Sequence, residues 1–263
     1  MTAPGIAGRR DGTLAGPDDE VLAFVADMFG LQLDQLAALL ANRGEPSGSA
    51  AGRAREVVAG WRAAGYADSE ELSVGQPWVW ASRQGLDACG FRPRLVRPPA
   101  RLLRHIHAVT DVRLALERTS AYREGGASWS PERQILARLG TPAREEHVPD
   151  GEVRWPAGCG LPWAGQTWAV EVELSRKSTE RTARIMREAL ARTGDYGCPP
   201  ASIAVPGQPP RYARLVYACS PSAVRTVLSA RAELGSPMSA HIDVHDLPEQ
   251  ALRLNTPKRG WQS

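Results

Sequence analysis

The segment Thr167–Ser178, TWAVEVELSRKS, constrains the fold most, because apolar and polar residues alternate along it. Side chains on a β-strand point to opposite faces in turn, so Val170 and Val172 share one face. Glu171 and Glu173 share the other face, about 7 Å apart. A core cannot bury two carboxylates without partners. The pattern therefore predicts a strand with one core face and one face that meets water, basic side chains or a cation.

A third carboxylate, Asp150, precedes Glu171 by 21 residues, in the motif VPDGEV. Adjacent strands could bring it beside Glu171 or Glu173, and oxygen ligands of this kind suit Mg²⁺. Lys177 would then orient an attacking water or balance the charge on a phosphate. The alternative is a solvated strand face, on which Arg176 and Lys177 pair with the glutamates.

The first 91 residues contain three helical patterns followed by two short strands. The helices are expected at 18–30, 31–44 and 49–66, and the strands lie within 67–90. Three helices followed by a hairpin is the order of a winged helix-turn-helix. In such a module the third helix enters the major groove of DNA.

The outer face expected for that third helix carries Ser49 and Glu56, flanked by Arg53 and Arg55. Ser49, Arg53 and Arg55 are the candidate contacts to double-stranded DNA, through phosphates or base edges. Glu56 would repel phosphate unless it accepts a hydrogen bond from cytosine. The alternative is a module that contacts only other proteins.

Beyond residue 100 the patterns follow the order α-β-β-β-α-β, then α-β. This order predicts an α+β chain whose second domain is an α/β domain with a mixed sheet. Segments 129–140 and 143–155 are expected as strands, with Glu132 on the first and His147 as a solvated residue on the second. The expected division is a disordered arm at 1–17, a winged helix at 18–91, a linker at 92–100, the second domain at 101–248 and a tail at 249–263.

Composition indicates the cellular compartment of the protein more clearly than its binding partner. The net charge of +3 and the pI of about 8.8 are too mildly basic to indicate nucleic acid by themselves. The four cysteines form no C-x-x-C pair and are irregularly spaced, which argues against structural zinc and a disulfide framework. The chain shows no signal peptide and no apolar run long enough for a membrane span. A soluble, cytoplasmic protein is expected.

Four short motifs follow one another behind the expected winged helix: HIHAVTDVRLAL, WSPE, PDG and VEVEL. In this order they resemble the replication-relaxation family, proteins of plasmids and other mobile elements that are common in actinobacteria. The resemblance covers roughly residues 18–230. The second half also resembles the PD-(D/E)xK nucleases, of restriction-endonuclease-like fold, whose core has the same α-β-β-β-α-β order.

The nuclease resemblance implies a catalytic set of Asp150, Glu171, Glu173 and Lys177. Asp150 and Glu171 would be metal-binding acids, and Glu173 stands where that superfamily usually has lysine. In the alternative register Glu173 is the second acid, which leaves Ser175 at the lysine position and Lys177 two residues further on. Glu132 is the third candidate ligand for Mg²⁺.

Glu117, on the helix before the first of these strands, is a rival to Glu132. The resemblance implies a DNA-binding protein of plasmid replication or maintenance, with a metal-dependent endonuclease or nickase activity. The alternative is an inactive regulator or replication accessory protein. Its nuclease-like domain would then serve homodimerisation or the docking of replication or conjugation proteins.

Overall fold

The computed structural model describes residues 17–73, 75–91, 96–139, 147–193 and 210–248. Contacts within the chain divide this part into two units, residues 17–110 and 111–248. The boundary lies inside helix α5 (Leu103–Glu117), beyond the linker expected at 92–100. The expected tail at 249–263 and nearly all of the expected arm at 1–17 lie outside the described residues.

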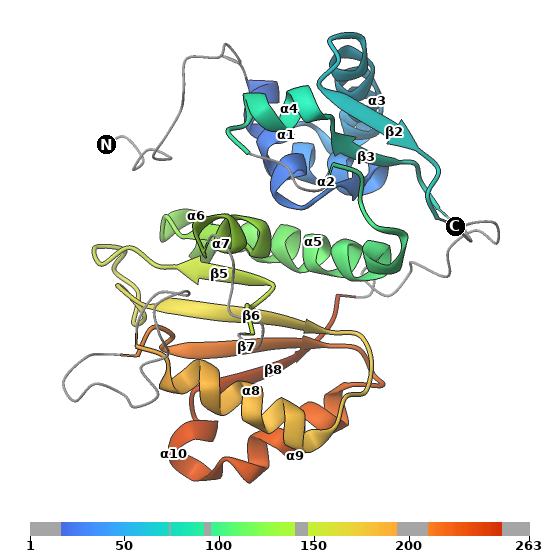
Figure 1. Cartoon of the computed structure of the whole chain (residues 1–263). Coiled ribbons are helices and arrows are strands. Elements are labelled where there is room, and N and C mark those ends of the chain that lie inside the picture. The colour runs from blue at the N-terminus through green and yellow to red at the C-terminus, as the bar shows by residue number, and fades with distance from the viewer. Residues whose placement is uncertain (1–16, 74, 92–95, 140–146, 194–209, 249–263) are drawn as a thin grey trace. The chain divides into compact units, whose positions relative to one another are not determined.

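The first unit contains four helices and three strands among its described residues, before the short 3₁₀ helix η1 (Ala100–Leu102) and helix α5 (Figure 1). These are α1 (Pro17–Asp27), β1 (Leu31–Gln32), α2 (Leu33–Asn42), α3 (Ser47–Ala63), β2 (Ala67–Glu70), β3 (Trp78–Ala81) and α4 (Arg83–Ala88). The strands form an antiparallel sheet in the order β1-β3-β2. The two-residue strand β1 was not expected, because so short a run shows no alternation.

The core of the first unit forms because α2 and α3 each carry an apolar stripe. Leu36 and Leu39 of α2 and Trp61 of α3 are buried, and Trp78 of β3 is fully buried. Gly30, between α1 and β1, has φ 136°, and a Cβ there would lie 2.9 Å from the carbonyl oxygen of the β3 residue that pairs with Leu31. Only glycine therefore allows β1 to approach β3 at this turn.

The second unit is built on a five-stranded sheet in the order β4-β5-β6-β7-β8. Its further elements are α6 (Ser120–Glu124), β4 (Ser128–Pro131), α7 (Glu132–Leu139), β5 (Gly151–Arg154), β6 (Thr167–Glu173), α8 (Thr179–Ala191), β7 (Arg214–Cys219), α9 (Val224–Glu233), α10 (Gly235–Ser239) and β8 (Ile242–Asp246). The β4–β5 and β5–β6 pairs are antiparallel, and the β6–β7 and β7–β8 pairs are parallel. The expected α+β class and mixed sheet are confirmed.

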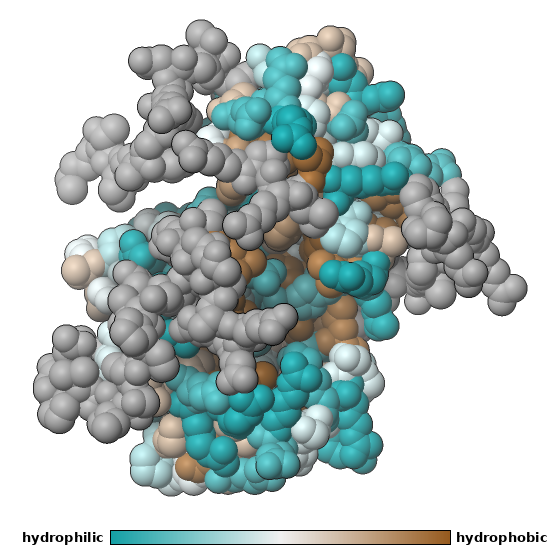
Figure 2. Space-filling model, in the orientation of Figure 1, coloured by the Kyte–Doolittle hydropathy of each residue, from teal (hydrophilic) through white to brown (hydrophobic). Residues whose placement is uncertain are grey.

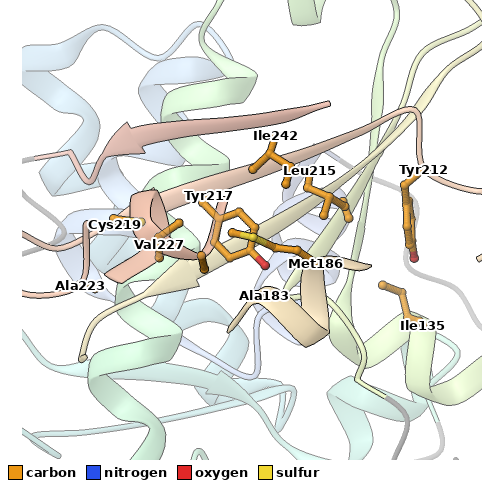
Figure 3. Close-up of a cluster of buried hydrophobic side chains, with 12 residues drawn as sticks. Ile135, Ala183, Met186, Tyr212, Leu215, Tyr217, Cys219, Ala223, Val227 and Ile242 are labelled. Carbon is orange, nitrogen blue, oxygen red and sulfur yellow. The ribbon is translucent and has the colours of Figure 1, made fainter. Parts of the chain in front are cut away.

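Helices α8 and α9 connect the parallel strands and pack on one face of the sheet (Figure 1), because parallel strands need crossover connections. Their inner residues meet Leu215, Tyr217 and Ile242 in one cluster, which also contains Met186 of α8 (Figure 3). The outer face of α8 is hydrophilic (Figure 2). No helix in the described part of the chain is both long and apolar enough to cross a membrane.

Segment 129–140 is not one strand, as expected, but strand β4 followed by helix α7. Pro131 ends the strand, since proline supplies no N–H to a sheet ladder. Glu132 then lies in the first helical turn, where the helix dipole favours a negative charge. Ile135, three residues further on, is buried in the core. The expectation that Glu132 lies on a strand is therefore wrong.

Candidate functional site

Asp150 immediately precedes β5, and the antiparallel register of β5 and β6 places it across from Glu171. Its Oδ2 accepts a hydrogen bond from the backbone N–H of Val172 at 2.7 Å. Gly151 follows, and a Cβ at this position would lie 2.1 Å from the Trp129 ring. The Trp129 ring thus packs directly on the backbone of Gly151, the residue that follows Asp150.

Glu171 and Glu173 lie on the sheet face that α8 and α9 cover, and each is only 6% exposed. The expectation of a solvated strand face is wrong, because the helices exclude water from it. A buried carboxylate is tolerated when a cation pairs with it. His147 Nε2 lies 2.7 Å from Glu171 Oε1, and Lys177 Nζ donates a hydrogen bond to Glu173 Oε1. The pairing of Lys177 with a glutamate was one of the expected alternatives.

His147 is the residue that sequence analysis missed. It was expected to be solvated, yet its side chain is only 31% exposed and it contacts Glu171. The two residues are 24 positions apart, and nothing in the local pattern indicates their contact. Only the strand register, which places Asp150 across from Glu171, brings the nearby His147 to the same place.

The ionisation of the His147–Glu171 pair is shifted by its surroundings. Burial raises the pKa of the Glu171 carboxyl to about 7, against the opposing effect of His147, while the charges of Asp150 and Glu173 add to the rise. Burial lowers the pKa of His147, but its hydrogen bond to Glu171 and the charges of Glu171 and Asp150 outweigh this, so its net pKa is raised. A proton can therefore be held between the two groups near neutral pH.

The parallel register of β6 and β7 places Tyr217 beside Glu171 and Cys219 beside Glu173. Burial and the neighbouring glutamates raise the pKa of Tyr217 well above its ordinary value. Burial and the charges of Glu173 and Asp246 raise the pKa of Cys219 to about 12. The Cys219 thiol therefore stays protonated at neutral pH and is a poor nucleophile.

The two other candidate acids have different surroundings. Glu132 begins α7, and its backbone N–H donates to the carbonyl oxygen of Asp150 at 3.2 Å. Glu117, on α5, accepts a hydrogen bond from Nε of Arg113 at 2.7 Å. The structure therefore brings the backbone of Glu132 to the site, whereas Glu117 is held in an ion pair on its own helix.

The acids as arranged do not fit a bound Mg²⁺. Glu171 and Glu173 each have a carboxylate oxygen in contact with a basic side chain of the same chain. One oxygen of Asp150 accepts the Val172 N–H. Within the described ranges, no group of three or more His, Cys, Asp or Glu side chains is placed to hold a metal ion.

The candidate DNA contacts on α3 also differ from one another. Arg53 is half-buried and donates to both carboxylate oxygens of Asp18 at 2.8 and 2.9 Å, so it ties α3 to the first turn of α1. Ser49 Oγ donates to the Glu45 carboxylate at 2.6 Å. Arg55 is exposed and donates a 3.3 Å hydrogen bond to the carbonyl oxygen of Ala51 in its own helix. Of the three, Arg55 is the side chain best placed to reach a partner.

The raised pKa of Glu171 predicts a pH-dependent loss of stability. The folded state holds the Glu171 proton more tightly than the unfolded state, whose pKa is about 4.5. The resulting stabilisation is complete below pH 4.5 and is lost as the pH rises through about 7. Relative to Glu171→Gln, the free energy of unfolding should fall by on the order of 3 kcal/mol across this window.

Urea unfolding of the wild type and of Glu171→Gln at several pH values measures this difference. The exposed Glu180, in the first turn of α8, supplies a control variant, Glu180→Gln. Its pH profile should follow that of the wild type. Parallel profiles for Glu171→Gln and the wild type would contradict the shifted Glu171 pKa.

No family model, no curated protein and no solved structure matches the chain.

Proposed function

We propose that this chain is a DNA-binding protein of a plasmid or mobile element, whose first unit is a winged helix-turn-helix. The observation that carries the proposal is the element order helix, strand, helix, helix, strand, strand, with the strands in the order β1-β3-β2. In such a module the helix before the hairpin lies in the major groove. That helix is α3.

The outer face of α3 suits close approach to a DNA backbone. Gly48, Gly52 and Gly60 are exposed, and a Cβ at any of them would meet no described atom within 4 Å beyond its chain neighbours and the nearby backbone of its own helix. Packing within the protein therefore does not require these glycines, although each lowers helix stability by about 1 kcal/mol relative to alanine. Arg55 and Arg62 are exposed on the same helix and supply positive charge for phosphates.

The second unit, in this proposal, is a nuclease-like domain that does not cut DNA. Apart from the short helices α6 and α7, which flank β4, its order is α5-β4-β5-β6-α8-β7, with β5 and β6 antiparallel and β6 and β7 parallel; this supports the likeness to PD-(D/E)xK nucleases. The pairing of Glu171 with His147 and of Glu173 with Lys177 favours the inactive form. Such a unit would serve homodimerisation or the docking of replication or conjugation proteins.

Fluorescence anisotropy with a labelled DNA duplex tests DNA binding by the full chain. We expect the logarithm of the affinity to fall linearly with the logarithm of the salt concentration, because bound phosphates release counterions. A panel of duplexes from DNA flanking the gene would reveal sequence preference. No detectable binding to any duplex at low salt would contradict the proposal.

A Mg²⁺-dependent endonuclease or nickase is the second candidate, favoured by the position of Asp150 across from Glu171. Nicking of a supercoiled plasmid in Mg²⁺ or Mn²⁺ separates the two candidates. We expect the wild type to leave the plasmid intact. Cutting that disappears in both Asp150→Ala and Glu171→Ala would instead establish the nuclease.

A further inference from the structure

We infer that the basic side chains of His147 and Lys177 occupy the acids of the second unit and so close this site to divalent metal ions. The inference rests on the proposed nuclease likeness in one respect: that likeness is the reason for using a divalent metal ion as the probe. DNA binding by the first unit is measured separately, so the two can fail independently.

The two basic side chains each contact one glutamate. The His147 ring lies 2.7 Å from Glu171 Oε1, and the Lys177 ammonium donates to Glu173 Oε1. Both glutamates are buried, whereas about a third of each basic side chain is exposed. The basic side chains are therefore the more solvent-exposed members of both pairs.

The charge balance shows why the cations matter. Asp150, Glu171 and Glu173 would together carry three negative charges when ionised, a strong local attraction for a divalent cation. Lys177 cancels one of these charges, and the His147 ring occupies Oε1 of Glu171. A metal ion would have to displace both side chains and also compete with the Val172 N–H for Asp150.

The chain itself places these cations beside the acids. Lys177 follows Glu173 by four residues, in the short connection between β6 and α8. That connection is fixed at the start of α8, where the Ser178 side chain accepts a hydrogen bond from the Arg181 N–H. Its other end is held by Ser220 Oγ, which donates to the carbonyl oxygen of Leu174 at 2.9 Å. The loop backbone is thus held at both ends, with Lys177 between them and in contact with Glu173.

Manganese binding to the full chain tests the inference without DNA. We would measure Mn²⁺ affinity by water-proton relaxation and the melting temperature with and without Mn²⁺ at matched ionic strength. Wild type should bind Mn²⁺ weakly and show no Mn²⁺-dependent shift in melting temperature. Lys177→Met should bind it roughly tenfold more tightly or better, because the acids lose a positive neighbour. Mn²⁺ should then raise the melting temperature of this variant.

Two further variants make the test specific. Arg176→Met removes an exposed cation next to Lys177 and should behave as the wild type does. Lys177→Met/Glu173→Gln should lose the gained affinity, because the freed carboxylate is gone. If Lys177→Met does not fold, His147→Gln replaces it, since that side chain is partly exposed and glutamine keeps a hydrogen-bond donor.

Three results would overturn the inference. If the wild type binds Mn²⁺ as tightly as Lys177→Met, the basic side chains do not close the site. If neither protein binds Mn²⁺, the acids are not a latent metal site. If the double variant keeps the gained affinity, the ion binds elsewhere.

Discussion

The double variant Arg55→Glu/Arg62→Glu should bind a DNA duplex about 100-fold more weakly than the wild type in ~0.1 M salt. Both side chains are exposed on α3 and form no ion pair within the described residues. Losing a phosphate contact weakens binding to all sequences and lowers the salt slope by about 1, so two contacts should lower it by about 2. Fluorescence anisotropy over a salt series measures both quantities.

A matched control separates the α3 surface from overall charge. Arg83→Glu/Arg118→Glu makes the same change in net charge at two exposed positions outside α3. It should weaken binding far less and keep the wild-type salt slope. Equal losses in the two double variants would show a non-specific charge effect. No loss in Arg55→Glu/Arg62→Glu would exclude α3 as the DNA contact.

Arg211→Met should lower the free energy of unfolding by about 3–5 kcal/mol at pH 8, because it removes a hydrogen-bonded cation from a buried carboxylate. Glu152, on β5, is only 2% exposed. Its Oε1 accepts hydrogen bonds from Arg211 Nη2 at 2.6 Å and Nε at 3.0 Å, and from the Tyr212 hydroxyl at 2.6 Å. Without the guanidinium, the charge on Glu152 would be much less well compensated.

Urea unfolding of a small set of variants tests this. Arg211→Met/Glu152→Gln should recover most of the lost stability, since a neutral amide costs less to bury than a carboxylate. Arg214→Met is the control. Arg214 Nη1 lies 2.7 Å from Asp243 Oδ2 in a comparable ion pair, but each of these side chains is more than a third exposed. It should cost about 1 kcal/mol or less. If Arg211→Met also lost no more stability than Arg214→Met, that result would contradict a structural role for the Arg211–Glu152 pair.

The sequence predicted the elements that have a regular period. The alternation around Val170 and Val172 gave strand β6, and the apolar stripes containing Leu36 and Trp61 gave α2 and α3. It also indicated that Asp150 could meet Glu171, which the register of β5 and β6 confirms. These predictions succeeded because they depend on local spacing and on the pairing of neighbouring strands.

Elements without a period were predicted less well. Segment 129–140 combines a four-residue strand with a helix, and a window that spans both shows neither pattern clearly. The change occurs at Pro131, which can end a strand but can also stand at its edge. The sequence alone does not choose between these roles, so Glu132 was placed on the wrong kind of element.

By itself, then, the sequence determined which residues alternate or repeat, and therefore the order of helices and strands. Only the tertiary structure decided the environment of the acids. Glu171 and Glu173 were compatible with a solvated face until α8 and α9 were seen to cover it. Covering that face removes water and leaves each carboxylate dependent on a cation. For Glu171 that cation is His147, 24 residues away in the chain, and such a pairing is set by strand register.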